Sequence, residues 1–362
     1  MIAYNPVAHA SRAETGCRSA PLFTCADQRL FEQIRQYAQY VRSARIWNGH
    51  FDLQKMPLYL VHRSGQRADR GFLLHVPVPV SGATPIFPPT AAGPPIYRYD
   101  KALRTAEKTD NGLFDFNFPI QGTPYFMMLY TDFDEPPTDI HATSREEWLR
   151  ILVHESFHVY QFDWIYPEYG EQEEAAYPLT PQILSLSLLE LTIANTALET
   201  RDPRRSETLL NMFVAVRHEK ILRDPSGRDI IHNMDNVQEY LEGTAKYVEV
   251  QTAEHFHPGF SREHYAFELD EPLSSGFQSQ DQMRDFFTFG LWYFTGSLVL
   301  QMMDRANIAF VEPMEQGQTP YAIAAARFRH TPEERTAHLM RAKREFNYPA
   351  LEKKAAQFLT LD

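Results

Sequence analysis

The chain has 362 residues, of which 43% are hydrophobic and 23% are charged, and its formal net charge is −12 at pH 7. This length and composition suit one large domain or two modest ones with a sizeable core. The acidic balance argues against nucleic-acid and anionic-membrane partners, because both normally require a concentrated basic patch. A neutral or cationic substrate is easier to accommodate.

Only two cysteines occur, Cys17 and Cys25. A disulfide scaffold and a cysteine-rich metal site are therefore excluded. We expect two free thiols, and the alternative is a single disulfide between them. The first residues lack the continuous apolar core of a signal peptide, and no later stretch reaches the ~20 apolar residues of a membrane span. We therefore expect a soluble, cytoplasmic protein.

The predicted elements change character near residue 140. A helix is expected over 27–46, where an apolar stripe is formed by Leu30, Ile34, Tyr37, Val41 and Ile46. Short β-rich runs separated by Pro and Gly clusters follow at 57–63, 71–78, 96–100 and 124–132. Later residues are almost all helical, with helices expected near 144–165, 181–200, 204–222, 235–256 and 282–306.

Strands followed by helices predict an α+β fold. We expect an N-terminal helix and β-rich lobe over 1–140 and a helical lobe over 141–362, either as one compact unit or with a groove between them. The run at 124–132 is expected to be a strand whose edge can pair with an extended peptide.

The motif HESFH lies on the helix predicted after residue 144. Ser144, followed three residues later by Glu147, forms a capping box that starts this helix. His154 and His158 are four residues apart, so they lie about 6 Å apart along the axis on nearly the same side, where both can bind one zinc ion. Glu155 lies about 100° further round, where it can hold a water molecule at the metal.

Apolar residues surround almost the whole helix, which predicts that it is buried. They are Trp148, Leu149, Ile151, Leu152, Val153, Phe157, Val159, Tyr160 and Phe162. A buried Glu155 carboxylate would cost several kcal/mol without a cation or a dense hydrogen-bond network nearby. Zinc supplies that cation. The alternative, a chance HExxH on a surface helix, is disfavoured by the capping box and the apolar pattern.

A catalytic zinc site usually has three protein ligands and one open position. The extended pattern HExxHxxGxxH is excluded, because Gln161 and Trp164 stand where its glycine and third histidine would be. The third ligand is therefore expected to be a carboxylate on a later helix.

Two glutamates compete on the helix predicted over 235–256, which Asp235 can cap. Glu242 lies about 100° from the centre of the apolar stripe and Glu239 about 160°, so Glu242 borders the core and Glu239 is expected to face solvent. The alternative for Glu242 is a solvated residue paired with Lys246. Gly243 costs the helix about 1 kcal/mol relative to alanine, which is most simply explained by close packing at that point.

These segments resemble the gluzincin metallopeptidases, in which HExxH is followed on a downstream helix by a glutamate ligand in an E-G-x-A context. The segments are HESFH at 154–158 and LEGTAKYVE at 241–249, of which the second is similar to the NEGFAxYxE stretch of the M1 aminopeptidases. LWYFTGSLVLQMMD at 291–304 is similar to the YxxG helix of the same group, whose tyrosine stabilises the tetrahedral oxyanion.

The resemblance implies a thermolysin-like catalytic domain with one Zn²⁺ per chain, held by His154, His158 and Glu242. Glu155 would be the general base and Tyr293 the oxyanion donor. Eighty-three residues separate His158 from Glu242, more than in the M1 group, and no GAMEN-like motif precedes the helix, so aminopeptidase specificity is not implied.

Two further assignments stay open. Tyr293 lies in an aromatic run, in which a buried core residue is the alternative to a catalytic one. His255, His257 and His264 are candidates for a second metal site, but we expect a surface cluster instead.

We therefore expect a zinc-dependent hydrolase, most specifically a metallopeptidase that acts on a peptide or a small amide. The alternatives are a zinc hydrolase of a non-peptide amide or ester, and a non-catalytic zinc-containing binding or scaffold protein. An intact Glu155 argues against the last alternative, because structural zinc sites need no general base and are usually closed by four protein ligands. The oligomeric state is not predicted.

Overall fold

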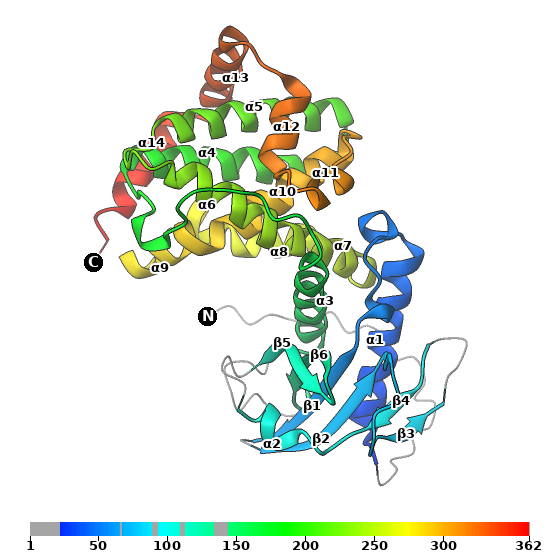
Figure 1. Ribbon diagram of the computed structural model, residues 1–362. Coiled ribbons are helices and arrows are strands. Elements are labelled where there is room, and N and C mark those ends of the chain that lie inside the picture. Colours follow the sequence, from blue (N-terminus) through cyan, green and yellow to red (C-terminus); the bar gives the residue numbers. More distant parts are fainter. Residues whose placement is uncertain (1–21, 66, 89–92, 109–112, 134–143, 362) are drawn as a thin grey trace. The chain divides into compact units, whose positions relative to one another are not determined.

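The computed structural model describes residues 22–65, 67–88, 93–108, 113–133 and 144–361 (Figure 1). The fold is mixed α+β, as the order of the predicted elements indicated. By their internal contacts, the described residues up to 42 together with those of 52–149 form one compact unit, and residues 43–51 together with the described residues from 150 on form another. The predicted division at residue 140 stays a prediction.

The first unit contains a six-stranded sheet in the order β3-β4-β2-β1-β6-β5. The strands are β1 (Leu58–Ser64), β2 (Arg67–Leu74), β3 (Thr84–Phe87), β4 (Ile96–Arg98), β5 (Phe114–Ile120) and β6 (Thr123–Tyr130). β1 pairs antiparallel with β2 and parallel with β6. The four predicted runs form β1, β2, β4 and β6, whereas β3 and β5 were not predicted, because β3 starts a proline-rich run and β5 carries polar residues at a register shift.

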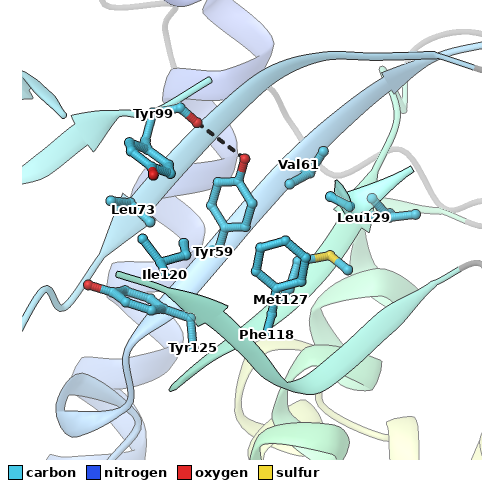
Figure 2. Packing of buried hydrophobic residues seen from close by; sticks show 10 residues of the cluster. Tyr59, Val61, Leu73, Tyr99, Phe118, Ile120, Tyr125, Met127 and Leu129 are labelled. Atoms are coloured by element: carbon cyan, nitrogen blue, oxygen red, sulfur yellow. Dashed lines mark hydrogen bonds between the residues drawn. The ribbon is translucent and has the colours of Figure 1, made fainter. Parts of the chain in front are cut away.

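One face of this sheet packs into a hydrophobic cluster (Figure 2). The buried members are Tyr59, Val61, Leu73, Tyr99, Ala106, Phe118, Ile120, Tyr125, Met127 and Leu129. The Tyr59 hydroxyl donates a hydrogen bond to the Tyr99 carbonyl oxygen at 3.2 Å. Gly71 permits this approach, because a Cβ at that position would lie 2.3 Å from the same carbonyl oxygen.

Helix α1 (Cys25–Ser43) packs on the opposite face, since side chains alternate along a strand and its Phe31 contacts Phe72 rather than Leu73. The ring centroids of Phe31 and Phe72 are 4.9 Å apart. Cys25 takes part in a disulfide, so the expectation of a free thiol is wrong for this residue. Cys17 lies outside the described residues.

The expectation of an exposed edge on the strand at 124–132 is wrong. β6 hydrogen-bonds to β1 on one side and to β5 on the other, so both of its edges are occupied. The reason is the pairing of β5, whose Asp115, Asn117 and Pro119 mask its strand character in the sequence. Pairing of β6 with an extended peptide is therefore excluded in this fold.

The second unit is helical. Its main helices are α3 from Arg150 on (whole helix Arg145–Gln161), α4 (Pro181–Leu198), α5 (Pro203–Leu222), α6 (Ile230–Gln238), α7 (Thr244–Phe256), α8 (Phe260–Glu268), α9 (Gln280–Asp285), α10 (Leu291–Arg305), α11 (Val311–Glu315), α12 (Pro320–Phe328), α13 (Pro332–Glu345) and α14 (Tyr348–Phe358). Thr180 and Asp202 cap α4 and α5, each followed by proline at the first helical position, where no N–H is needed.

Helix α10 lies at the centre of this unit and packs against α4, α5 and α7 (Figure 1). The stretch Gln280–Arg305 is the only one among the described residues that is long and apolar enough to cross a membrane by composition, and 78% of its most apolar window is buried. Such burial is typical of a core helix.

The helix predicted over 235–256 differs from the observed one in two ways. α6 begins at Ile230, and Asp235 is completely buried within it, so Asp235 is not a cap. A π-helical turn, η4 (Glu239–Gly243), separates α6 from α7. This turn changes the direction in which the residues after Gln238 point.

The close packing predicted from Gly243 is confirmed. A Cβ on Gly243 would lie 2.6 Å from the Gly296 Cα, and a Cβ on Gly296 would lie 2.8 Å from the Gly243 Cα. Two glycines, one on η4 and one on α10, therefore allow direct backbone contact between the two segments.

We expect Gly296→Ala to lower the free energy of unfolding by about 1 to 3 kcal/mol, because its Cβ would force the two backbones apart. Gly290→Ala is the matched control, since its nearest neighbour is a Phe286 ring carbon at 3.4 Å, an ordinary contact. Alanine favours the helix there, so this variant should be neutral or stabilised. Urea unfolding of both variants checks this; equal effects would contradict it.

Candidate metal centre

The two histidines of HESFH lie side by side on α3. The Ser144 hydroxyl accepts a hydrogen bond from the Glu147 amide at 3.2 Å, so the Ser144 half of the predicted capping box is confirmed. The ring centroids of His154 and His158 are 4.9 Å apart, and their Nε2 atoms are 3.2 Å apart. Phe162 is one of the apolar residues from which burial of this helix was predicted, but this residue is 57% exposed.

Glu242 completes a triangle of donor atoms with the two histidines. Its Oε2 lies 3.4 Å from the His154 Nε2 and 3.2 Å from the His158 Nε2. Ligands at ~2.0 to 2.1 Å from a tetrahedral zinc ion are separated by roughly 3.3 to 3.4 Å. The triangle therefore fits one zinc ion, and it is the only such group of His, Cys, Asp and Glu in the part of the chain that the structure describes.

The other ring nitrogen of each histidine is held by a hydrogen-bond acceptor. The His154 Nδ1 donates to the Glu249 carboxylate at 3.1 Å, and the His158 Nδ1 donates to the Gln161 Oε1 at 2.6 Å. The orientation of the Gln161 amide is fixed, because its Nε2 donates to the Leu241 carbonyl oxygen at 3.1 Å, which can only accept. When either imidazole is neutral its proton is therefore on Nδ1, and its Nε2 lone pair faces the centre of the triangle.

Glu249 and Gln161 were not assigned a role from the sequence. Glu249 follows Glu242 by seven residues, which is about two helical turns, so a shared face was the available signal. Its carboxylate also accepts hydrogen bonds from the Lys246 ammonium at 2.9 and 3.1 Å. Lys246 thus pairs with Glu249, and the alternative pairing with Glu242 is not observed.

Burial and charge define the electrostatics of the triangle. Burial lowers the pKa of His154, but its hydrogen bonds to Glu242 and Glu249 outweigh this effect and raise the pKa to about 9. Burial raises the pKa of Glu242, but the two histidines hold it well below its usual range. A divalent cation in the triangle would therefore compete with the His154 proton.

Glu155 lies beside the triangle without belonging to it. Its side chain is half-buried, and burial raises its pKa despite the nearby His154 and His158. A carboxylate with a raised pKa, close to a cation site but not occupied as a ligand, is suited to accept and return a proton.

Tyr293 is brought to the same place by α10. Its ring stacks on His154 with centroids 5.7 Å apart and planes at 14°. Burial and a hydrogen bond to Glu242 raise its pKa well above the usual range, so the hydroxyl keeps its proton at neutral pH. Its neighbours Trp292 and Phe294 are buried core residues, whereas Tyr293 is half-buried at the site.

The helical angle predicted that Glu239 faces solvent, and this prediction is wrong. Glu239 is completely buried. It forms two hydrogen bonds with Arg217, at 2.6 and 3.0 Å. There are two reasons for the error. Arg217, the partner of Glu239, is distant in the sequence, and the π turn departs from the rotation of 100° per residue that the prediction assumed.

The three downstream histidines do not form a metal group among the described residues. His255 is exposed, while His264 stacks on Phe260 with centroids 5.0 Å apart. Burial, reinforced by Lys246 and Arg150, lowers the pKa of His264 to about 3.

The chain was compared with known protein families, curated proteins and solved structures, and none of them matches it. The interpretation of the site therefore depends on its own residues and geometry.

We expect the purified protein to bind about one zinc per chain by elemental analysis, and His158→Ala and Glu242→Ala to lose it. Glu249→Gln should keep the stoichiometry but bind zinc roughly 10- to 100-fold more weakly in a chelator competition, because the acceptor that orients His154 loses its negative charge. Glu254→Gln is the control, since the Glu254 carboxylate caps the Gly259 and Ser261 amides instead. Unchanged binding in Glu242→Ala would exclude Glu242 as a ligand.

The low pKa of His264 makes stability depend on pH. Its folded pKa lies below the unfolded value of about 6.5, so the unfolded chain binds the proton first and stability falls as the pH drops from about 6.5 toward 3. His264→Gln should remove up to about 1.4 kcal/mol per pH unit from this slope. Urea unfolding of both proteins with a chelator present, at several pH values from 7 to 4, measures it. Parallel curves would refute the assignment.

Proposed function

We propose that the protein is a zinc-dependent hydrolase with a thermolysin-like, gluzincin-type catalytic region, and most specifically a metallopeptidase. One observation carries the proposal. Three donor atoms from His154, His158 and Glu242 lie 3.2 to 3.4 Å apart, with both Nδ1 atoms already held by acceptors. Two imidazoles and one carboxylate are a donor set that suits catalytic zinc, which keeps a fourth position open.

When bound, zinc lowers the pKa of a coordinated water toward neutrality and polarises a carbonyl oxygen. The chain's residues would then divide the remaining work. Glu155 accepts a proton from the attacking water, because its carboxylate lies beside the triangle and its pKa is raised by burial. His154 and His158 keep their orientation through Glu249 and Gln161.

Attack forms a carbon–oxygen bond at the substrate carbonyl and places negative charge on the carbonyl oxygen. Tyr293 is positioned to donate a hydrogen bond to that oxygen, because its hydroxyl keeps its proton and its ring stacks on His154. The carbon–nitrogen bond then breaks, and Glu155 returns the proton to the leaving amine. A peptide or small amide is the substrate class that this sequence of proton transfers suits.

We expect Glu155→Gln to retain zinc and to lose at least about 100-fold in rate, because no other group takes the proton. Tyr293→Phe should retain zinc and lose about 10²- to 10³-fold in kcat, as for removal of one oxyanion donor. The control is Tyr265→Phe, since the Tyr265 hydroxyl bonds to Ser297 and not to the triangle.

The assay uses the zinc-loaded protein with a mixture of quenched-fluorescent peptides, followed by mixtures of simple amides and esters. Cleavage that stops in chelator and returns with zinc supports the proposal. Cleavage of esters or non-peptide amides alone would favour the wider class of zinc hydrolases. Two results would overturn the hydrolase proposal and favour a binding role. In one, the zinc-loaded native protein cleaves none of these substrates; in the other, the Glu155→Gln variant cleaves them as fast as the native protein.

A further inference from the structure

The helical unit contains a second group of ionisable side chains, which is distinct from the triangle of His154, His158 and Glu242. It has five members, and all of them are completely buried. Its members are Glu190 on α4, Arg217 and Lys220 on α5, Asp235 on α6 and Glu239 on η4, and each of them is 0% exposed. The cluster contains three carboxylates and two cations. We refer to these five residues as the buried charge cluster.

Arg217 contacts all three carboxylates, since its Nε also lies 3.3 Å from the Asp235 carboxylate. Its guanidinium donates to Glu239 at 2.6 and 3.0 Å, and to Glu190 at 2.6 and 3.2 Å. Lys220 joins Glu190 to Asp235, with its ammonium 2.8 Å from Glu190 and 2.7 Å from Asp235. Glu239 is thus the only member of the cluster that lies on η4, and Arg217 holds both of its oxygens.

A second hydrogen bond holds Glu239 from α10. The Thr295 hydroxyl donates to the Glu239 carboxylate. Thr295 precedes Gly296, whose absent side chain lets α10 touch η4, and a Cβ there would lie 2.9 Å from the Glu239 carbonyl oxygen. The first residue of η4 is therefore fixed by ionic contacts from α5 and by close packing from α10.

Glu242 lies three residues after Glu239 within the same π turn. A π turn has i→i+5 hydrogen bonds and holds more residues than an α turn, so it rotates every side chain that follows its first residue. If η4 relaxed to an α turn, Glu242 would point in a different direction relative to His154 and His158. Such single π turns are rare and are frequently found at functional sites, and the described residues contain two more, η5 (Glu271–Ser275) and η6 (Phe286–Gly290).

Stability alone does not account for the cluster. Burying ions costs several kcal/mol each, and a well-packed apolar replacement is often equally stable. What an ion pair adds is a defined geometry, because two bidentate groups fit in one arrangement only.

We propose that Glu239 and Arg217 form a positioning pair that holds η4 in its π conformation and thereby directs the Glu242 carboxylate at the metal. This inference depends on the metal centre proposed above and extends it to residues that do not touch the ion. It does not depend on hydrolase activity.

The test compares Glu239→Gln with Glu190→Gln. Both variants remove one carboxylate charge from the same cluster, and both carboxylates are bound by Arg217, but only Glu239 lies on η4. We expect zinc affinity in a chelator competition to fall about 10- to 100-fold in Glu239→Gln and to stay within about threefold of the native value in Glu190→Gln. The visible spectrum of the Co²⁺-substituted protein, which reports ligand geometry, should change only in Glu239→Gln.

A second pair of variants addresses the same contact without removing a charge. Thr295→Val deletes the hydroxyl that donates to Glu239, and Ser187→Ala deletes the hydroxyl that accepts from Lys220 elsewhere in the cluster. Only Thr295→Val should weaken zinc binding and alter the Co²⁺ spectrum. If Glu239→Gln does not fold, as circular dichroism would show, this pair decides the question.

The outcomes are separable from those of the proposed function. A native protein that binds neither zinc nor Co²⁺ would remove the metal centre and this inference together. If the native protein binds zinc, the metal centre stands and the variants test the positioning pair. Equal affinities and spectra in Glu239→Gln and Glu190→Gln, or in Thr295→Val and Ser187→Ala, would overturn that pair.

Discussion

The backbone contact between η4 and α10 is the constraint on which the candidate site depends. Gly243 and Gly296 allow the two segments to touch, and a Cβ on either glycine would lie under 3 Å from the opposite backbone. Because of this contact, Glu242 on η4 reaches both histidines of α3, and Tyr293 on α10 stacks on one of them, His154. A site built from three rigid elements keeps its donor atoms in place better than one built on loops.

Charge is the second organising feature of the helical unit. Around the triangle, Glu242 and Glu249 both contact His154, and Lys246 balances the outer of the two carboxylates. Beneath η4, the buried charge cluster places further carboxylates and cations out of contact with solvent. Each buried ion is stable only with its partners, so both groups impose a defined arrangement on the helices that carry them.

Local patterns predicted much of this structure. The cap at Ser144 and the pair His154 and His158 at helical spacing are each determined by neighbours within one or two turns, and a glycine inside a helix was enough to predict close packing at Gly243 without its partner Gly296. The prediction failed for Glu239, because a constant rotation per residue does not describe a π turn and because its partner Arg217 is 22 residues away. It also failed for the edge of β6, because the pairing partner β5 has a weak strand pattern.

By itself, the sequence determined the helix that carries HESFH, the two histidines on one side of it and the neighbouring Glu155, because these depend only on helical periodicity and capping. The burial of Glu239 against Arg217, the distance of Glu242 from the two histidines, the place of Tyr293 at the site and the acceptors for each Nδ1 were decided by tertiary structure. They depend on contacts between helices far apart in the chain, whose distances and directions are fixed only when the helices pack.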